Sequence, residues 1–204
     1  MNTLKSARVE RGETTRRLLL DATIDMLLES GLATCSLAAV AKRAGMTTGA
    51  VQHHFKTKAV LMRAVIAERL FVHDRELTPS DWTDMTLGQR CQMLVDHQWH
   101  YYGKPRYIAI WDIILGARAD KAIQREIASW QSAGTKVHEN LIAEVLSDWG
   151  VKTRDVRMLQ FFMNSHLRGL AMLRTVQDDQ RIVDAQLALL GEALARHVEA
   201  LSAL

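Results

Sequence analysis

Helix-breaking residues are scarce in this chain, whose 204 residues include two prolines, Pro79 and Pro105. Period-2 runs of Val, Ile and Thr are missing as well, so strands are not expected. So few helix breakers in so long a chain favour long helices. The composition, 48% apolar and 24% charged, suits a protein that buries a core. We therefore predict an all-α fold of about nine helices.

Cysteines and long apolar runs are also few. Cys35 and Cys91 lie far apart without CxxC spacing, which argues against a zinc site or a disulfide framework. Both are expected to be reduced, packed thiols, with redox sensing as the alternative. The first fifteen residues lack the apolar segment of a signal peptide, and no run reaches the ~18 apolar residues of a membrane span. We expect a cytoplasmic protein with no cofactor and no membrane partner.

Positive charge is concentrated in the first quarter of the chain. Residues 1–58 carry nine Lys or Arg against five acids, whereas the remainder carries seventeen against eighteen. This asymmetry suits a nucleic-acid contact near the N-terminus, although a solvated surface would explain the charge equally well.

Apolar spacing and capping residues predict where the helices lie. We expect helices at about residues 15–28, 36–43, 48–54, 58–75, 87–102, 106–117, 121–149, 153–176 and 181–201. The loop 77–81 is the candidate junction between functional regions. The predicted domains are a helix-turn-helix at 1–58, with a basic N-terminal arm, and a ligand-binding and dimerisation domain at 59–204. A helix at 58–76 would connect them.

The sharpest local signal is the segment 36–58, SLAAVAKRAGMTTGAVQHHFKTK. Gly45 allows a sharp turn between two short helices, and Thr47 can cap the second. The inward-facing side chains are expected to be Val40, Ala41, Ala44, Ala50, Val51 and Phe55. Such a pair forms a helix-turn-helix, whose second helix can lie in the major groove of DNA.

The outward side of that second helix is polar and uncharged. It presents Thr47, Thr48, Gly49, Gln52, His53 and His54. A surface built only for solubility would carry more Lys and Glu. Gly49 costs about 1 kcal/mol relative to Ala in a helix, so we expect it to allow a close approach of the backbone to DNA.

These residues resemble the signature of the tetracycline repressor (TetR) family over about residues 14–70. The matching positions are Ala44, Gly45, Thr47, Gly49, His54, Phe55, Lys58 and Leu61. Gln52 departs from the pattern, because the family usually has a phosphate-contacting Tyr there. A Gln can instead read adenine through two hydrogen bonds.

The resemblance implies a ligand-responsive transcriptional regulator, of the repressor type, that binds a palindromic operator in double-stranded DNA as a homodimer. It implies phosphate contacts from Thr47, His54 and Lys58 and base contacts from Thr48, Gln52 and His53. Thr15, Arg16 and a mobile arm with Lys5, Arg8, Arg11 and Arg17 would add further DNA contacts.

The last two predicted helices are apolar over a wide arc, which indicates burial on two sides. One side can pack on its own chain and the other on a partner, giving a four-helix bundle of two chains. The candidate dimer interface is formed by Leu159, Met163, Leu170, Leu187, Leu190 and Leu194. A monomer with a thick core is the alternative.

Aromatic and soft side chains in the middle helices suggest a chamber for a small hydrophobic or aromatic effector. The candidates are Trp99, Tyr102, Trp111, Phe162 and His166, although ordinary core packing would also account for each of them. Arg168 and Arg174 could meet a carboxylate on such a ligand. His97 and His100 alone do not make a metal site, so none is predicted.

Two other classes of protein stay open from the residues alone, a helical enzyme and a scaffold without sequence-specific DNA binding. No nucleophile elbow, Gly-rich phosphate loop or HExxH motif occurs, so no catalytic residue is predicted.

Overall fold

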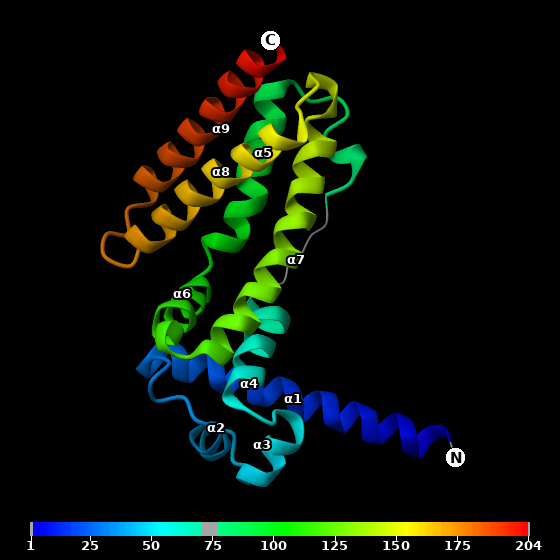
Figure 1. Cartoon of the computed structure of the whole chain (residues 1–204), viewed down its shortest axis with the longest axis vertical. Coiled ribbons are helices and arrows are strands. Elements are labelled where there is room, and N and C mark those ends of the chain that lie inside the picture. Colours follow the sequence, from blue (N-terminus) through cyan, green and yellow to red (C-terminus); the bar gives the residue numbers. More distant parts are fainter. Residues whose placement is uncertain (1, 71–76, 204) are drawn as a thin grey trace. The chain divides into compact units, whose positions relative to one another are not determined.

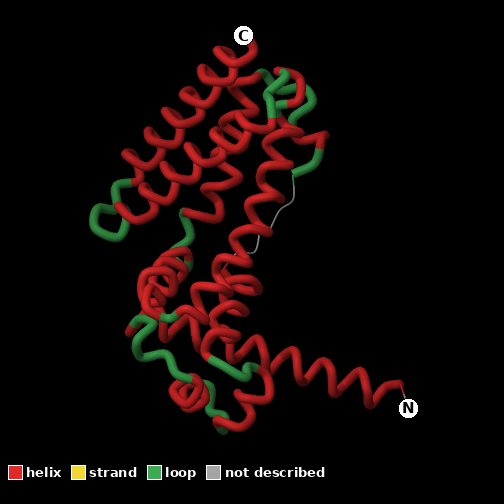
Figure 2. The backbone as a smooth tube through the Cα atoms, in the orientation of Figure 1, coloured by secondary structure: helices red, strands yellow, loops and turns green. Residues whose placement is uncertain are grey.

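The computed structural model describes residues 2–70 and 77–203, and throughout these the secondary structure is helical, without strands (Figure 2). The α-helices are α1 (Asn2–Ser30), α2 (Leu37–Arg43), α3 (Thr48–His54), α4 (Lys58–Val65), α5 (Leu87–Tyr102), α6 (Tyr107–Gly116), α7 (Lys121–Val145), α8 (Thr153–Leu173) and α9 (Gln180–Ser202). Short 3-10 turns cover Pro79–Asp81, Ala117–Ala119 and Ser147–Trp149. The all-α prediction is confirmed.

Several predicted boundaries are wrong. α1 begins at Asn2, so the predicted mobile arm is helical, and Thr14 bonds the Glu10 carbonyl instead of capping a helix. The connecting helix ends as regular α-helix at Val65 and continues as a π-helix over Ile66–Leu70. Its last predicted residues, 71–76, lie outside the described residues. α7 and α8 stop earlier than periodicity alone indicated, because apolar spacing continues past the true ends.

The chain forms two compact units. Unit 1 consists of residues 1–72 and 106–131, and unit 2 of residues 73–105 and 132–204. The division differs from the predicted domains, because α4, α6 and the first part of α7 cluster with the helix-turn-helix. No helix among the described residues is both long and apolar enough to cross a membrane.

In unit 1, capping side chains start each short helix. Ser36 Oγ accepts a hydrogen bond from the Ala39 N–H at 3.1 Å, and Thr47 Oγ1 accepts one from the Ala50 N–H at 3.2 Å. Thr57 caps α4 in the same way. Gly45 adopts φ +66° between α2 and α3, a left-handed conformation that most residues avoid. Short helices that are marginal by themselves are therefore fixed at both ends.

Apolar side chains pin α3 against the rest of unit 1. Val40, Val51 and Phe55 are all fully buried, whereas Ala50, which was expected to face inward, is exposed. Arg43 on α2 forms a two-point ion pair with Glu29 on α1. We call the segment 36–58, whose apolar side chains form a small closed core, the head. Its short helices α2 and α3 pack together (Figure 1).

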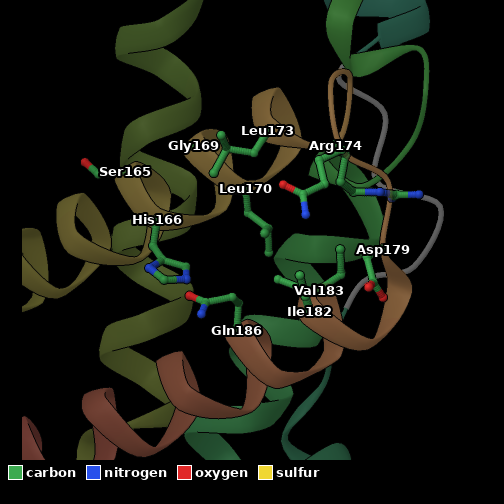
Figure 3. Close-up of a pocket in the computed structure, with 11 residues that line it drawn as sticks. Ser165, His166, Gly169, Leu170, Leu173, Arg174, Asp179, Ile182, Val183 and Gln186 are labelled. Carbon is green, nitrogen blue, oxygen red and sulfur yellow. The ribbon is translucent and has the colours of Figure 1, made fainter.

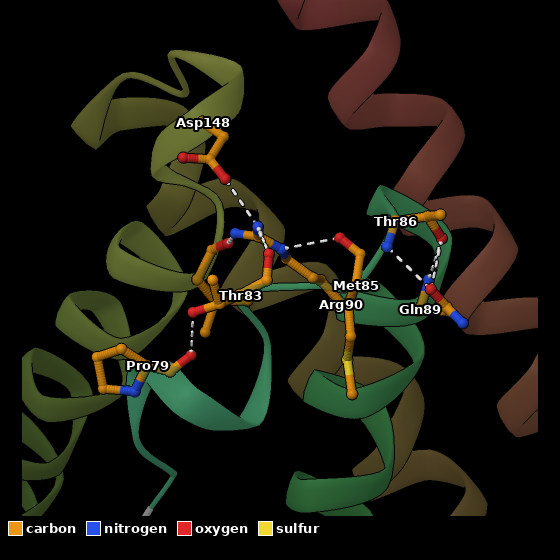
Figure 4. Close-up of polar contacts among 8 residues, drawn as sticks. Pro79, Thr83, Met85, Thr86, Gln89, Arg90 and Asp148 are labelled. Carbon is orange, nitrogen blue, oxygen red and sulfur yellow. Dashed lines mark hydrogen bonds and ion pairs between the residues drawn. The ribbon is translucent and has the colours of Figure 1, made fainter.

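In unit 2, α5 packs mainly against α9 and also against α8, and α8 and α9 run side by side (Figure 1). Arg90 on α5 is 5% exposed and ties three segments together (Figure 4). Its guanidinium donates to the carbonyls of Val145, Met85 and Thr83 and pairs with Asp148 at 2.7 Å. A buried cation is tolerated here because each of these acceptors compensates its lost hydration.

Candidate DNA interface and effector site

The face of α3 that was predicted to meet DNA is exposed. Thr48, Gly49, Gln52 and His53 are all solvent-accessible, as is the capping residue Thr47. Residues 48 and 52 are one helical turn apart, as are 49 and 53, so these side chains share one side of α3. The opposite side is closed by buried Val51. The structure therefore brings these five residues together on one surface.

His54 stands at the edge of this surface and is half-buried. Burial lowers the pKa of its imidazole, and the nearby His53 and Arg16 lower it further. Its ring lies 6.3 Å from that of Phe55. His54 is therefore held mainly as the neutral imidazole, which can still donate a hydrogen bond to a phosphate.

Two predicted DNA contacts are occupied inside unit 1. The Lys58 ammonium donates to the Leu32 carbonyl at 2.7 Å, so it fastens α4 to the turn after α1. The Arg16 guanidinium forms an ion pair with Glu68 and lies 4.5 Å above the Phe55 ring. These contacts hold α3 and α4 within unit 1, and the DNA contacts expected of the two cations stay a prediction. Their partners, Leu32 and Glu68, are too distant in sequence for a motif to reveal them.

Five further residues of α1 were predicted to contact DNA, and the structure describes the side chains of three of them. Thr15 is half-buried on α1, while Arg11 and Arg17 are exposed. The side chains of Lys5 and Arg8 lie outside the described residues. Lys42 and Lys56, which sequence reasoning left out of the site, are exposed at the end of α2 and just after α3. The basic balance of residues 1–58 was the one signal that pointed to them.

The five predicted effector residues differ in burial and are divided between the two units. Tyr102 is buried in unit 2, at 1% exposure. Trp99 is half-buried under Arg174, whose guanidinium lies 5.8 Å from its ring, and Trp111 belongs to unit 1. Phe162 is 49% exposed, so it faces away from the interior. The prediction was wrong for Phe162 because the sequence of α8 alone does not show which of its apolar faces is buried.

His166 lies in a groove between α8 and α9 rather than among the other candidates (Figure 3). The groove has a volume of about 450 Å³. Its lining residues are Ser165, His166, Gly169, Leu170, Leu173, Arg174, Gln177, Asp179, Ile182, Val183 and Gln186. It is open to solvent and mainly apolar, with polar groups near its two ends.

Gln98 and Asn164, which the sequence did not single out, have buried side-chain oxygens in unit 2, on the same helices as Tyr102 and Arg168. Gln98 on α5 is 1% exposed, and its Oε1 finds no hydrogen-bond partner among the described residues. Asn164 Oδ1 on α8 is likewise buried without a partner there. Arg168, one turn further along α8, lies 5.8 Å from the ring of Tyr102. Burial raises the pKa of the Tyr102 phenol, so its hydroxyl stays protonated, although Arg168 opposes this shift.

The predicted dimer-interface residues are buried in their own chain. Leu159, Met163, Leu170, Leu187, Leu190 and Leu194 are each between 1% and 7% exposed within the single chain. A side chain already covered by its own protomer offers no surface to a partner, so that assignment is corrected. The exposed apolar side chains of α8 and α9 lie on another face. They include Met158, Phe161, Phe162, Ile182 and Leu189, which we call the apolar face.

Both cysteines are buried, as expected for packed thiols. Burial raises the pKa of Cys35, and Lys58 partly offsets this rise. Burial also raises the pKa of Cys91, to about 12. Thiolates are therefore scarce at both positions near neutral pH. Among the described residues, no three His, Cys, Asp or Glu side chains gather as metal ligands would.

Comparison with known proteins adds independent support for the head. Residues 19–65 match the family model "Bacterial regulatory proteins, tetR family". The chain is 26% identical over 187 residues to the HTH-type transcriptional regulator CymR of Pseudomonas putida, covering 88% of this chain and 89% of CymR.

Solved structures share the fold. NalD of Pseudomonas aeruginosa, the secondary repressor of the MexAB-OprM multidrug efflux pump, aligns with a TM-score of 0.62 and 22% identity over 91% of this chain and 96% of NalD. FadR of Bacillus subtilis, solved in complex with stearoyl-CoA, aligns with a TM-score of 0.64 and 14% identity over 89% of this chain and 96% of FadR. Together with the exposed polar face of α3, these matches show that residues 19–65 form a helix-turn-helix of the tetR type, in a chain that is similar over most of its length to a transcriptional regulator.

Proposed function

We propose that this protein is a ligand-responsive repressor that binds a palindromic operator as a homodimer and is released by a small hydrophobic or aromatic effector. The observation that carries the proposal is the surface of α3, where Thr48, Gln52 and His53 are exposed on a helix pinned from behind by Val51 and Phe55. Neutral hydrogen-bonding groups on a rigid support are what reading base edges in the major groove requires.

Within this surface the roles differ. Thr48, Gln52 and His53 read base edges, and Thr47 and His54 bond phosphates that set the register. The Thr47 hydroxyl already accepts the Ala50 N–H, but its own proton is available to a phosphate oxygen. Gly49 has no neighbouring atom within 4 Å of where a Cβ would stand, so nothing in the protein itself calls for a glycine there. A close approach of DNA backbone explains it.

The apolar face supports the homodimer. Phe161 is 69% exposed, Met158 64% and Leu189 54%, on two helices that lie side by side. Exposed apolar side chains clustered in this way mark association surfaces in soluble proteins. A second copy would cover them through a two-fold contact, and a two-fold dimer reads a palindrome.

The effector would act by shifting a population. It must bind the DNA-released state more tightly than the DNA-bound state, since equal affinity would shift nothing. FadR, which shares the fold, was solved in complex with stearoyl-CoA, and this supports binding of a small molecule by the present chain. NalD, described as a repressor, supports the direction of control.

Selection of binding sites from random duplex DNA tests the proposal with the full-length protein. We expect an enriched palindrome, and Gln52→Ala and Thr48→Ala should weaken binding to it far more than binding to random DNA. Lys42→Ala is the matched control, because an exposed cation should lower both affinities together and flatten the salt dependence. Enrichment of no sequence, or equal losses on both DNAs in the Gln52 and Thr48 variants, would refute the proposal.

A further inference from the structure

Inside unit 2, α5 and α8 each carry polar side chains at two successive turns, and we pair these turns as two levels. Tyr102 lies beside Arg168, and further back along both helices Leu94 lines the same internal void as Leu159 and Met163. The two helices therefore run in the same direction (Figure 1). Gln98 lies one turn before Tyr102, and Asn164 lies one turn before Arg168, so these two amides form the second level.

The second level carries buried oxygens that the chain itself leaves unsatisfied. Gln98 Oε1 and Asn164 Oδ1 are buried, and neither has a hydrogen-bond partner among the described residues. An orphaned buried acceptor loses its hydration without compensation, so native proteins seldom keep one without a reason. Gln160, the next polar residue back along α8, shows the ordinary solution, because its amide donates to the Thr135 carbonyl at 3.2 Å.

The first level is cationic and donating. The guanidinium of Arg168 offers a planar set of N–H groups that matches a carboxylate in two-point geometry. The phenol of Tyr102 remains protonated because burial raises its pKa, so it can donate a further hydrogen bond. A group recognised by both would be an anion with several acceptor oxygens.

We propose that Gln98, Tyr102, Asn164 and Arg168 bind an effector that is a hydroxylated organic acid. Arg168 and Tyr102 hold its carboxylate, while the single proton of a hydroxyl at its other end is shared between two acceptors, Gln98 Oε1 and Asn164 Oδ1. One helical turn of four residues advances about 6 Å, which sets the separation of the two ligand groups. An aromatic ring with substituents at opposite ends has this length. The assignment rests on the proposed function, because it names the effector class of the same regulator.

Matched triplets of compounds test the assignment on the full-length protein without DNA. Each triplet contains an aromatic or aliphatic hydroxy acid, its uncharged primary amide and the acid without the hydroxyl, such as 4-hydroxybenzoate, 4-hydroxybenzamide and benzoate. We expect thermal unfolding and calorimetry to show binding of at least one hydroxy acid, with the other two members of its triplet about tenfold weaker or more. Binding of no hydroxy acid, or equal binding of the amide, would overturn the assignment.

Variants locate the site. Arg168→Met should weaken binding of that acid at least about thirtyfold, because it removes one partner of a buried charge pair. Arg174→Met is the matched control, since Arg174 caps the C-terminus of the same helix and lies at the same 5.8 Å from an aromatic ring, that of Trp99. If Arg174→Met loses the acid and Arg168→Met keeps it, the acid binds at the groove and the assignment is wrong.

Gln98→Leu separates a ligand-binding role from a merely structural one. Replacing an unsatisfied buried amide by an apolar side chain of similar size should leave the ligand-free protein as stable or more stable. The same change should weaken the hydroxy acid about two- to tenfold while leaving the acid without the hydroxyl unaffected. Unchanged affinity for the hydroxy acid would mean that water alone satisfies Gln98.

The failure of this assignment is distinct from failure of the proposed function. Operator release is measured separately, by fluorescence anisotropy of labelled DNA. An acid that binds through Arg168 without releasing DNA would refute the repressor switch and leave the assignment standing. An uncharged compound that releases DNA equally from wild type and Arg168→Met would refute the assignment and leave the switch standing.

Discussion

In the head, the apolar side chains of Val51 and Phe55 are fully buried, while polar Thr48 and Gln52 are exposed. In unit 2, by contrast, Gln98 is 1% exposed and Phe161 is 69% exposed. The head therefore buries its apolar side chains and exposes polar ones, which can form hydrogen bonds with water or with DNA. Unit 2 instead buries polar groups and exposes apolar ones, and both arrangements are unfavourable in free energy. These two features of unit 2 are the basis of the two partners that we propose, a ligand for the interior and a second copy for the apolar face.

The largest effect is expected where unit 2 buries a charge. Arg90→Met should lower the free energy of unfolding by about 3–5 kcal/mol, because it removes an ion pair and leaves buried carbonyls such as that of Val145 without a donor. Urea denaturation measures the change. Arg181→Met is the control, since its pair with Asp179 is exposed and should be worth less than about 1 kcal/mol. Similar losses in the two variants would mean that burial of Arg90 contributes nothing.

A second pair of variants separates the core of α8 from its apolar face. Met163→Ala should cost about 2–4 kcal/mol, because Met163 is 1% exposed and the change leaves a cavity. Phe161→Ser should instead leave the folded protomer intact and shift the dimer towards monomer in sedimentation equilibrium. Dissociation by Met163→Ala without loss of protomer stability would restore the interface that the sequence suggested, and a dimer unaffected by Phe161→Ser would remove the apolar face from the contact.

The sequence predicted the head more completely than unit 2, and the reason is the range of the interactions. Thr47 caps a helix three residues away, and Gly45 makes its turn locally, so a motif records both. Leu159 and Phe161 are both large apolar side chains on the same helix. Packing against helices distant in sequence decides that Leu159 is buried and Phe161 exposed.

Long-range partners explain the other failures in the same way. Lys58 reaches a carbonyl 26 residues away, and Arg16 pairs with a carboxylate 52 residues away. Periodicity reports which face of a helix is apolar, but it cannot report which element covers that face or which buried amide lacks a partner. The buried amides of unit 2 were therefore not predicted, although Tyr102 and Arg168 were.

Gly49→Ala should raise the stability of the head and weaken its binding to DNA. Nothing in the protein lies within 4 Å of the new Cβ, so the change should stabilise α3 by about 0.5–1 kcal/mol. The same methyl group should weaken binding to the selected operator if the DNA backbone lies against this position. Chemical denaturation and gel-shift titration of one preparation measure both effects. A stabilised variant with wild-type operator affinity would show that DNA does not approach Gly49.

The smallest effect is a pH dependence at the edge of the same surface. His54 has a pKa below its ordinary value of 6.5, first through burial and then through His53 and Arg16. Below pH 6.5 the unfolded chain therefore binds a proton that the folded chain resists, so stability should fall as the pH drops through this value, while above it the full stability is present. Comparison of wild type with His54→Asn at pH 7.5 and 5.5 isolates this contribution. Because burial is the larger cause, Arg16→Met should keep most of it. If Arg16→Met abolishes the pH dependence, then repulsion between cations, and not the closed core of the head, keeps His54 neutral.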